Sequence, residues 1–213
     1  MDTSCNNSFI VFSSTNTGMG KFIRHITHNT YNHTSICLDG KFYELYSFAR
    51  KHINSPFCGG LVVETPARYI TDGKDVMVKV CRIDPKVFSP DTMNERLEKI
   101  FSQKDSFIYN TYGAIVSPLR IKLCPYHSFT CVEFVSYILG IKKPMYSVKQ
   151  LEKIFDKYKI YEGSYKKLIE RYSDNATFPK DDYNTRLTKR AVLLGTARQF
   201  YDSAKRSLGR YPK

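Results

Sequence analysis

The chain lacks the long apolar segments that carry proteins into or across membranes. No stretch of its 213 residues approaches the roughly 18 to 20 uninterrupted apolar residues of a membrane span. The opening residues, MDTSCNNSFIVFSS, also lack the basic lead and long apolar run of a signal peptide. We therefore expect a cytoplasmic protein, and its 42% of hydrophobic residues is enough for an ordinary globular core.

Cysteine pairs with metal-binding spacing are also missing. None of the cysteines forms a C-x-x-C pair, so a structural zinc site is not expected. In a reducing compartment, free thiols are expected rather than disulfides. The sequence predicts no metal and no cofactor. The six cysteines are Cys5, Cys37, Cys58, Cys81, Cys124 and Cys131.

Acidic residues are scarce relative to basic ones. The chain has 33 Lys and Arg against 20 Asp and Glu, a formal net charge of +13, which predicts attraction to nucleic acid, a membrane surface or an acidic substrate. Residues 183–213 hold eight Lys and Arg against Asp202 alone, so +7 of the +13 lies there and +6 in the rest. No nucleic-acid motif and no basic-aromatic stripe is present, which argues against nucleic acid as the partner.

Apolar patterns predict short strands and helices in a mixed order. Strands are expected in FIVFSS, on both sides of an Asp39-Gly40 turn, and in LVVET and DVMVKVCRI. Helices are expected after Gly20, from Pro90 through the following MNERLEKIFSQ, and in CVEFVSYILG up to Gly140.

Cys131 stands at the predicted start of the apolar helix CVEFVSYILG. Free backbone N–H groups and the helix dipole at such a position favour a thiolate and can also bind an oxyanion. The alternative interpretation is a small buried core residue.

His33 and Glu44 are the candidate partners of Cys131. His33 begins the first strand of the predicted hairpin, where a rigid backbone would hold a base within reach of a thiol. Glu44 follows eleven residues later on the neighbouring strand, where its carboxylate could orient the imidazole. Alternatively, His33 is a structural histidine and Glu44 an exposed edge-strand residue.

Three sequence blocks resemble the permuted papain-fold NlpC-type cysteine hydrolases of the YaeF/YiiX group, in the form found in Firmicute bacteria. The blocks are NHTSICLD at 32–39, LYSFARK at 45–51 and TCVEFV at 130–135, with Gly59-Gly60 and VVE at 62–64 between them. The likeness covers roughly residues 8 to 170. Ala49 replaces the family's usual glycine and Val132-Glu133 replaces its Ser-x, but neither change removes a catalytic group.

The resemblance implies an α+β fold in which a small antiparallel sheet packs against the nucleophile helix. It also implies a Cys131–His33–Glu44 triad that forms an acyl-enzyme from an amide, ester or thioester in a peptide, lipid or small molecule. The oxyanion donors would be the Cys131 N–H and a tyrosine upstream of it, for which Tyr112 is the candidate and Tyr109 an alternative. An acyl-binding protein with an idle triad is the rival interpretation.

The last forty residues have no counterpart in the family. We therefore expect a hydrolase domain at residues 1–172 and, at 173–213, a hinge followed by a basic helix from about Thr185 to Leu208. Its apolar stripe should dock on the domain or a partner subunit, or bind an anionic membrane surface, making the protein peripheral to the membrane. The stripe consists of Leu194, Ala197, Tyr201, Ala204 and Leu208.

Overall fold

The protein is described by a computed structural model. The residues that it describes are 7–15, 24, 29–70, 74–116, 121, 123–171 and 181–208.

A six-stranded antiparallel sheet forms the centre of the fold, with the strand order β4-β3-β2-β1-β5-β8. The central strand β1 is buried along its whole length, as expected for a continuous apolar run. The predicted hairpin is present as β2 and β3, and Gly40 in its turn has a φ of +69°. The strands are β1 Phe9–Ser13, β2 His33–Cys37, β3 Leu45–Arg50, β4 Gly59–Glu64, β5 Met77–Arg82 and β8 Lys159–Ser164.

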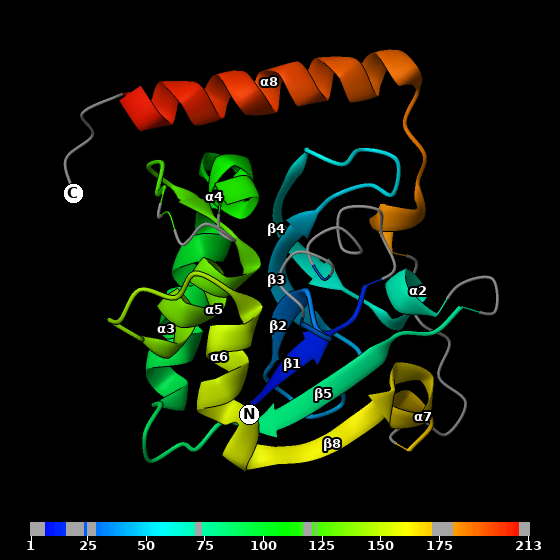
Figure 1. The fold of residues 1–213 in the computed structure, drawn as a ribbon, viewed down its shortest axis with the longest axis vertical. Coiled ribbons are helices and arrows are strands. Elements are labelled where there is room, and N and C mark those ends of the chain that lie inside the picture. The colour runs from blue at the N-terminus through cyan, green and yellow to red at the C-terminus, as the bar shows by residue number, and fades with distance from the viewer. Residues whose placement is uncertain are drawn as a thin grey trace.

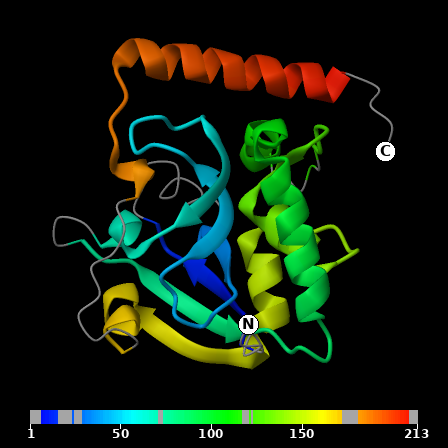
Figure 2. The same ribbon diagram turned by 180° about the vertical axis from the view of Figure 1, so that it is seen from behind.

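Helices cover both faces of the sheet (Figures 1 and 2). On one face lie α3 Pro90–Ser102, α5 Cys131–Leu139 and α6 Val148–Phe155, and on the other lie the short helices α2 Pro66–Tyr69 and α7 Tyr165–Glu170. Each face has its own apolar core, centred on Phe48 and Phe134 on the first and on Val80 and Tyr165 on the second. The α+β class is therefore confirmed.

Two predicted helices have the expected ends. Ser89 caps α3 by accepting a hydrogen bond from the Thr92 backbone N–H, and α5 ends at Gly140, whose φ is +70°. The predicted helix after Gly20 lies almost entirely outside the described residues. No described helix is long and apolar enough to cross a membrane.

The C-terminal helix α8, Lys189–Leu208, crosses one end of the molecule (Figure 1). Its start is slightly later than predicted. It packs beside α4, Thr111–Val116, and near the two-stranded parallel ribbon of β6 Ile108–Tyr109 and β7 Ser128–Phe129. Phe200 packs against Phe57 with ring centroids 5.3 Å apart.

The predicted apolar stripe of α8 does not make this contact. Leu194, Tyr201 and Leu208 are 60%, 67% and 86% exposed, whereas Gln199 and Ser203 on the opposite side are buried. The expectation that the stripe docks on its own domain is wrong, because α8 is attached through another side, which carries Gln199, Ser203 and Phe200.

Candidate active site

The local sequence places Cys131 at the first position of α5. Thr130 and Glu133 form a capping box, in which the Glu133 N–H donates to Thr130 Oγ1 (3.2 Å) and the Thr130 N–H donates to Glu133 Oε2 (2.7 Å). Glu133, a departure from the family pattern, thus sets the start of the helix. The structure gives the backbone N–H of Cys131 no acceptor among the described residues, so this group is available to an oxyanion.

His33 lies between Cys131 and a buried carboxylate. His33 is the first residue of β2 and pairs with Ser13 of β1 across the sheet. Its side chain is buried. Cys131 lies near enough to the ring to help raise the pKa of His33, and His33 Nε2 is 2.9 Å from Oε1 of Glu64. Because Nε2 faces Glu64, Nδ1 is the nitrogen left for the thiol. This is the arrangement of a nucleophile, a base and an orienting acid.

The orienting acid is Glu64, not the predicted Glu44. Glu44 is exposed and accepts a hydrogen bond from the hydroxyl of Tyr46 (3.2 Å). The reason is the register of the hairpin: Ile36 pairs with Tyr46, so Glu44 belongs to the turn end, whereas His33 begins β2 at the opposite end. Glu64 is the last residue of β4, two strands away from β2 in the sheet.

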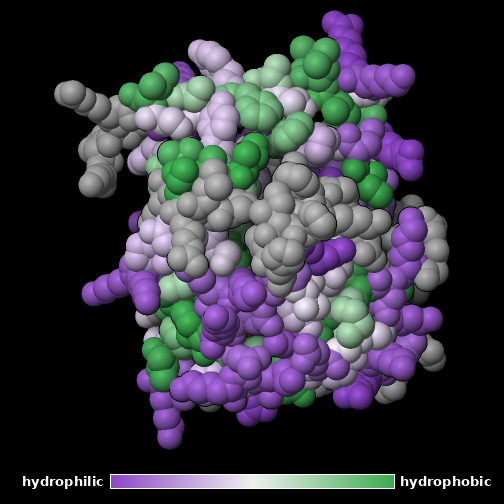
Figure 3. Space-filling view, in the orientation of Figure 1, coloured by the Kyte–Doolittle hydropathy of each residue, from purple (hydrophilic) through white to green (hydrophobic). Residues whose placement is uncertain are grey.

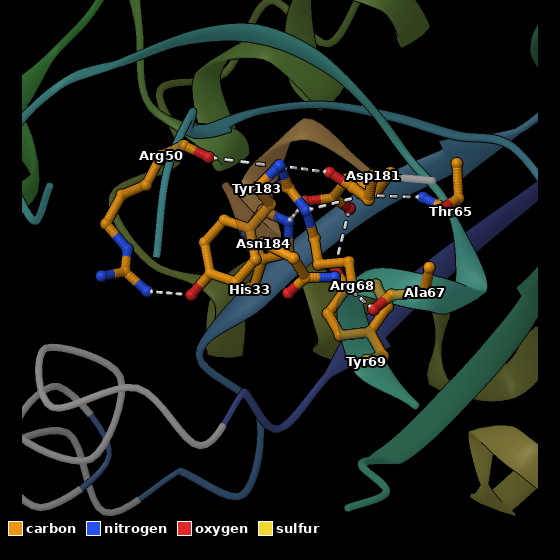
Figure 4. Close-up of polar contacts among 10 residues, drawn as sticks. His33, Arg50, Thr65, Ala67, Arg68, Tyr69, Asp181, Tyr183 and Asn184 are labelled. Carbon is orange, nitrogen blue, oxygen red and sulfur yellow. Dashed lines mark hydrogen bonds and ion pairs between the residues drawn. The ribbon is translucent and has the colours of Figure 1, made fainter. Parts of the chain in front are cut away.

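Glu64 is held by the side chains of Arg68 and Tyr69, and Figure 4 shows these two residues with the contacts between Arg68 and Asp181. The short helix α2 begins at Pro66 and turns Arg68 and Tyr69 back toward the carboxylate. Arg68 Nη1 donates to Oε1 (3.1 Å) and the Tyr69 hydroxyl donates to Oε2 (2.8 Å). Glu64 is only 1% exposed, and these donors replace the water that a buried carboxylate loses.

The residues after position 180 contribute to this support. Asp181 accepts two hydrogen bonds from the Arg68 guanidinium, at 3.2 and 3.3 Å, and one from the Thr65 N–H at 3.1 Å. The Arg68 guanidinium also lies over the ring of Tyr183, 4.5 Å from its centroid. The segment at 181–184 thus packs into the support of the site. The predicted hinge lies mostly outside the described residues.

Charge pairing dominates the titration of His33 and Glu64. Burial alone lowers the pKa of His33, but the charge of Glu64 and the hydrogen bonds to Cys131 and Glu64 raise it to about 10. Burial likewise acts to raise the pKa of Glu64, but His33, Arg68 and Tyr69 lower it to about 2. A cationic imidazole beside the thiol and an ionised Glu64 are therefore favoured at neutral pH.

The structure places Tyr112 away from the site. Its hydroxyl donates to the backbone carbonyl of Phe200 in α8 (3.4 Å), and its ring packs on Phe200. The alternative tyrosine, Tyr109, lies next to Cys131: burial and the charges of Cys131 and Glu133 raise the pKa of its phenol. The hydroxyl thus stays protonated at neutral pH and can donate a hydrogen bond.

A pocket opens on Cys131 from the side of α4 and α6. Tyr31, Asn32, Tyr109, Val132, Val148 and Lys149 are among the residues that line it with Cys131. Apolar, amide and cationic groups therefore surround the thiol, a mixture that suits an acyl compound with a polar end. Among the described residues, no group of His, Cys, Asp and Glu could hold a metal ion.

Comparisons with protein-family models, curated proteins and solved structures give no match to this chain.

Sequence reasoning identified Cys131 and His33 but missed the supporting residues. Glu64 is the next-to-last residue of the predicted strand LVVET, and an acid directly after two β-branched residues and before Thr65-Pro66 was the available signal. Arg68 stands four residues after Glu64, but Asp181 has no comparable signal, because it reaches Arg68 only through the tertiary fold.

Exchanging Glu64 for glutamine tests the assignment of the orienting acid. We expect Glu64→Gln to slow alkylation of Cys131 by iodoacetamide about tenfold or more, since glutamine keeps the shape but removes the charge that holds His33 protonated and oriented. The rate is measured by mass spectrometry of the cysteine peptides. The matched control is Glu44→Gln, which should label at the wild-type rate; equal slowing of both variants would contradict the assignment.

Proposed function

We propose that this chain is a cysteine hydrolase or acyltransferase with a circularly permuted papain-like arrangement of the NlpC type. The observation that carries the proposal is the buried His33, whose Nε2 bonds to Glu64 and whose titration is influenced by Cys131 at the start of α5. The chain order, with the histidine strand before the nucleophile helix, is the order of the permuted group. We also propose that the protein acts in the cytoplasm, the location expected from the sequence.

The reaction begins with attack of the Cys131 thiolate on an acyl carbonyl carbon, which forms a C–S bond. The developing oxyanion accepts hydrogen bonds from the Cys131 N–H and the hydroxyl of Tyr109. His33 then gives its proton to the leaving amine, alcohol or thiol as the scissile bond breaks.

Deacylation uses the same groups in reverse. His33, now neutral, accepts a proton from water, whose oxygen attacks the thioester carbon. The C–S bond breaks, the carboxylic acid leaves, and the proton on His33 restores the starting ion pair. An amine or alcohol in place of water gives acyl transfer.

Thiol labelling separates chemical activation from simple exposure. Cys124 is exposed and Cys131 is buried, so accessibility alone predicts that Cys124 reacts first. We expect iodoacetamide at neutral pH to label Cys131 at least about tenfold faster than Cys124, because a helix N-terminus and a cationic imidazole both favour the thiolate.

Turnover is measured with activated ester and thioester substrates, with Cys131→Ser as the inactive control. Equal labelling of Cys131 and Cys124 would overturn the proposal. Selective labelling without turnover or an acyl adduct would favour the idle acyl-binding protein.

A further inference from the structure

The C-terminal helix α8 is docked through a side that carries Gln199, Arg206 and Phe200. Gln199 donates to the backbone carbonyl of Tyr109 (2.8 Å), and Arg206 Nη1 donates to the carbonyls of Ser106 (2.7 Å) and His127 (3.0 Å). Gly195 allows close approach, because a Cβ there would lie 2.9 Å from the Sγ of Cys58. These contacts determine which side of α8 faces the solvent.

The outward side of α8 combines apolar and basic side chains. At 100° per residue, Leu194, Tyr201 and Leu208 lie within about 40° of one another, opposite Gln199 and Ser203. All three are more than half exposed, and Leu193, at the edge, is 71% exposed. Figure 3 shows hydrophobic and hydrophilic side chains interleaved along this helix.

The charge of this side is strongly positive. Arg190, Arg198 and Lys205 lie beside the apolar stripe and are exposed. Asp202 is the only acid of α8, and its Oδ2 is 3.8 Å from Nε of Arg198. The helix as a whole has five Lys and Arg against this one acid.

We propose that the outer face of α8, defined by Leu194, Tyr201, Leu208, Arg198 and Lys205, binds an anionic lipid bilayer. An exposed apolar stripe flanked by arginine and lysine fits the headgroup boundary, where leucine and tyrosine enter the acyl region and the cations meet lipid phosphates and carboxylates. The helix of 20 residues gives a contact roughly 30 Å long.

Charge complementarity favours a bilayer over a second copy of the chain. In a symmetric dimer built on this face, the basic side chains of one helix would meet those of the other, which opposes association. A bilayer with anionic lipids supplies the missing negative charge over the whole length of the helix. The proposal does not depend on the chemistry of Cys131.

The test is sedimentation of the full chain with vesicles of phosphatidylcholine, with and without phosphatidylserine, at low and high salt. Wild type should bind the phosphatidylserine vesicles at least tenfold more strongly, and high salt should weaken this binding. Two variants should each bind the phosphatidylserine vesicles at least tenfold more weakly than wild type. The triple variant L194S/Y201S/L208S removes the apolar part of the contact, and the double variant R198Q/K205Q removes the charged part.

Two matched controls make the result specific. M77S/V87S/I160S removes three exposed apolar side chains elsewhere, and K142Q/K143Q removes two exposed charges in the loop after α5; both should bind like wild type. Circular dichroism checks that each variant is folded.

Three results would overturn the proposal. The first is equal binding of wild type to both vesicle types, or none to either. The second is an equal loss of vesicle binding in the α8 variants and in their matched controls. The third is a lipid-free dimer in sedimentation velocity that the triple variant abolishes, which would assign the face to a second copy instead.

Discussion

Replacing His33 by alanine is expected to slow alkylation of Cys131 at neutral pH by about a hundredfold or more and to abolish ester turnover. The imidazole lies beside Cys131, which helps raise the pKa of His33, and a positioned acid or base typically contributes about 10²- to 10⁴-fold to such chemistry. The alkylation rate of each cysteine is followed by mass spectrometry, so that the other thiols serve as internal references.

Chemical rescue distinguishes a missing base from a damaged fold. His33→Ala leaves a space beside Cys131 and Glu64, and added imidazole should recover part of the labelling rate there. The control His52→Ala changes a histidine of the loop between β3 and β4 and should label like wild type. Wild-type labelling in the folded His33→Ala protein would show that the base is another residue.

The two predicted site residues that the structure brings together, Cys131 and His33, are indicated by local signals. Cys131 lies between a capping threonine and an apolar helix, and His33 begins a strand that is apolar enough to be buried. Both patterns extend over fewer than about ten residues, within the range over which hydrophobic periodicity and capping are informative.

The orienting acid could not be chosen from local signals because it depends on strand register. A tight turn at Asp39-Gly40 suggests that Glu44 lies near His33, but the observed pairing of Ile36 with Tyr46 places Glu44 near the turn. Glu64 reaches the imidazole from β4, and Asp181, which shares Arg68 with Glu64, follows 117 residues after Glu64. Such long-range contacts depend on how the sheet is assembled.

For α8, periodicity predicts which residues share a face but not where that face points. The stripe of Leu194, Tyr201 and Leu208 is apolar, yet the hydrogen bonds of Gln199 and Arg206 attach the opposite side to the domain. An apolar stripe is therefore evidence of a surface that needs a partner, and here the described part of the domain does not provide it.

Arg68→Met is expected to destabilise the fold by about 3–5 kcal/mol, the usual cost of removing one member of a buried ion pair. The Arg68 side chain is 6% exposed and lies between Glu64 and Asp181, which are 1% and 3% exposed. Methionine fills much of the volume but leaves two buried carboxylates without their shared cation. Urea unfolding followed by circular dichroism measures the change. Arg82→Met, at an exposed position of β5, should change stability by less than about 1 kcal/mol.

The double variant R68M/D181N separates loss of charge pairing from loss of packing. Once Arg68 is gone, asparagine at 181 removes one unpaired buried charge and can still accept from the Thr65 N–H, so the double variant should be more stable than R68M alone. In the wild-type background, D181N removes a favourable partner of Arg68 and should destabilise. This reversal of sign is the signature of coupling through charge. If D181N destabilises both backgrounds equally, the Arg68–Asp181 pair contributes no charge coupling, and the segment at 181–184 is held by its other contacts, among them the hydrogen bonds from Arg50 to the Tyr183 hydroxyl and from Asn184 to the Ala67 carbonyl.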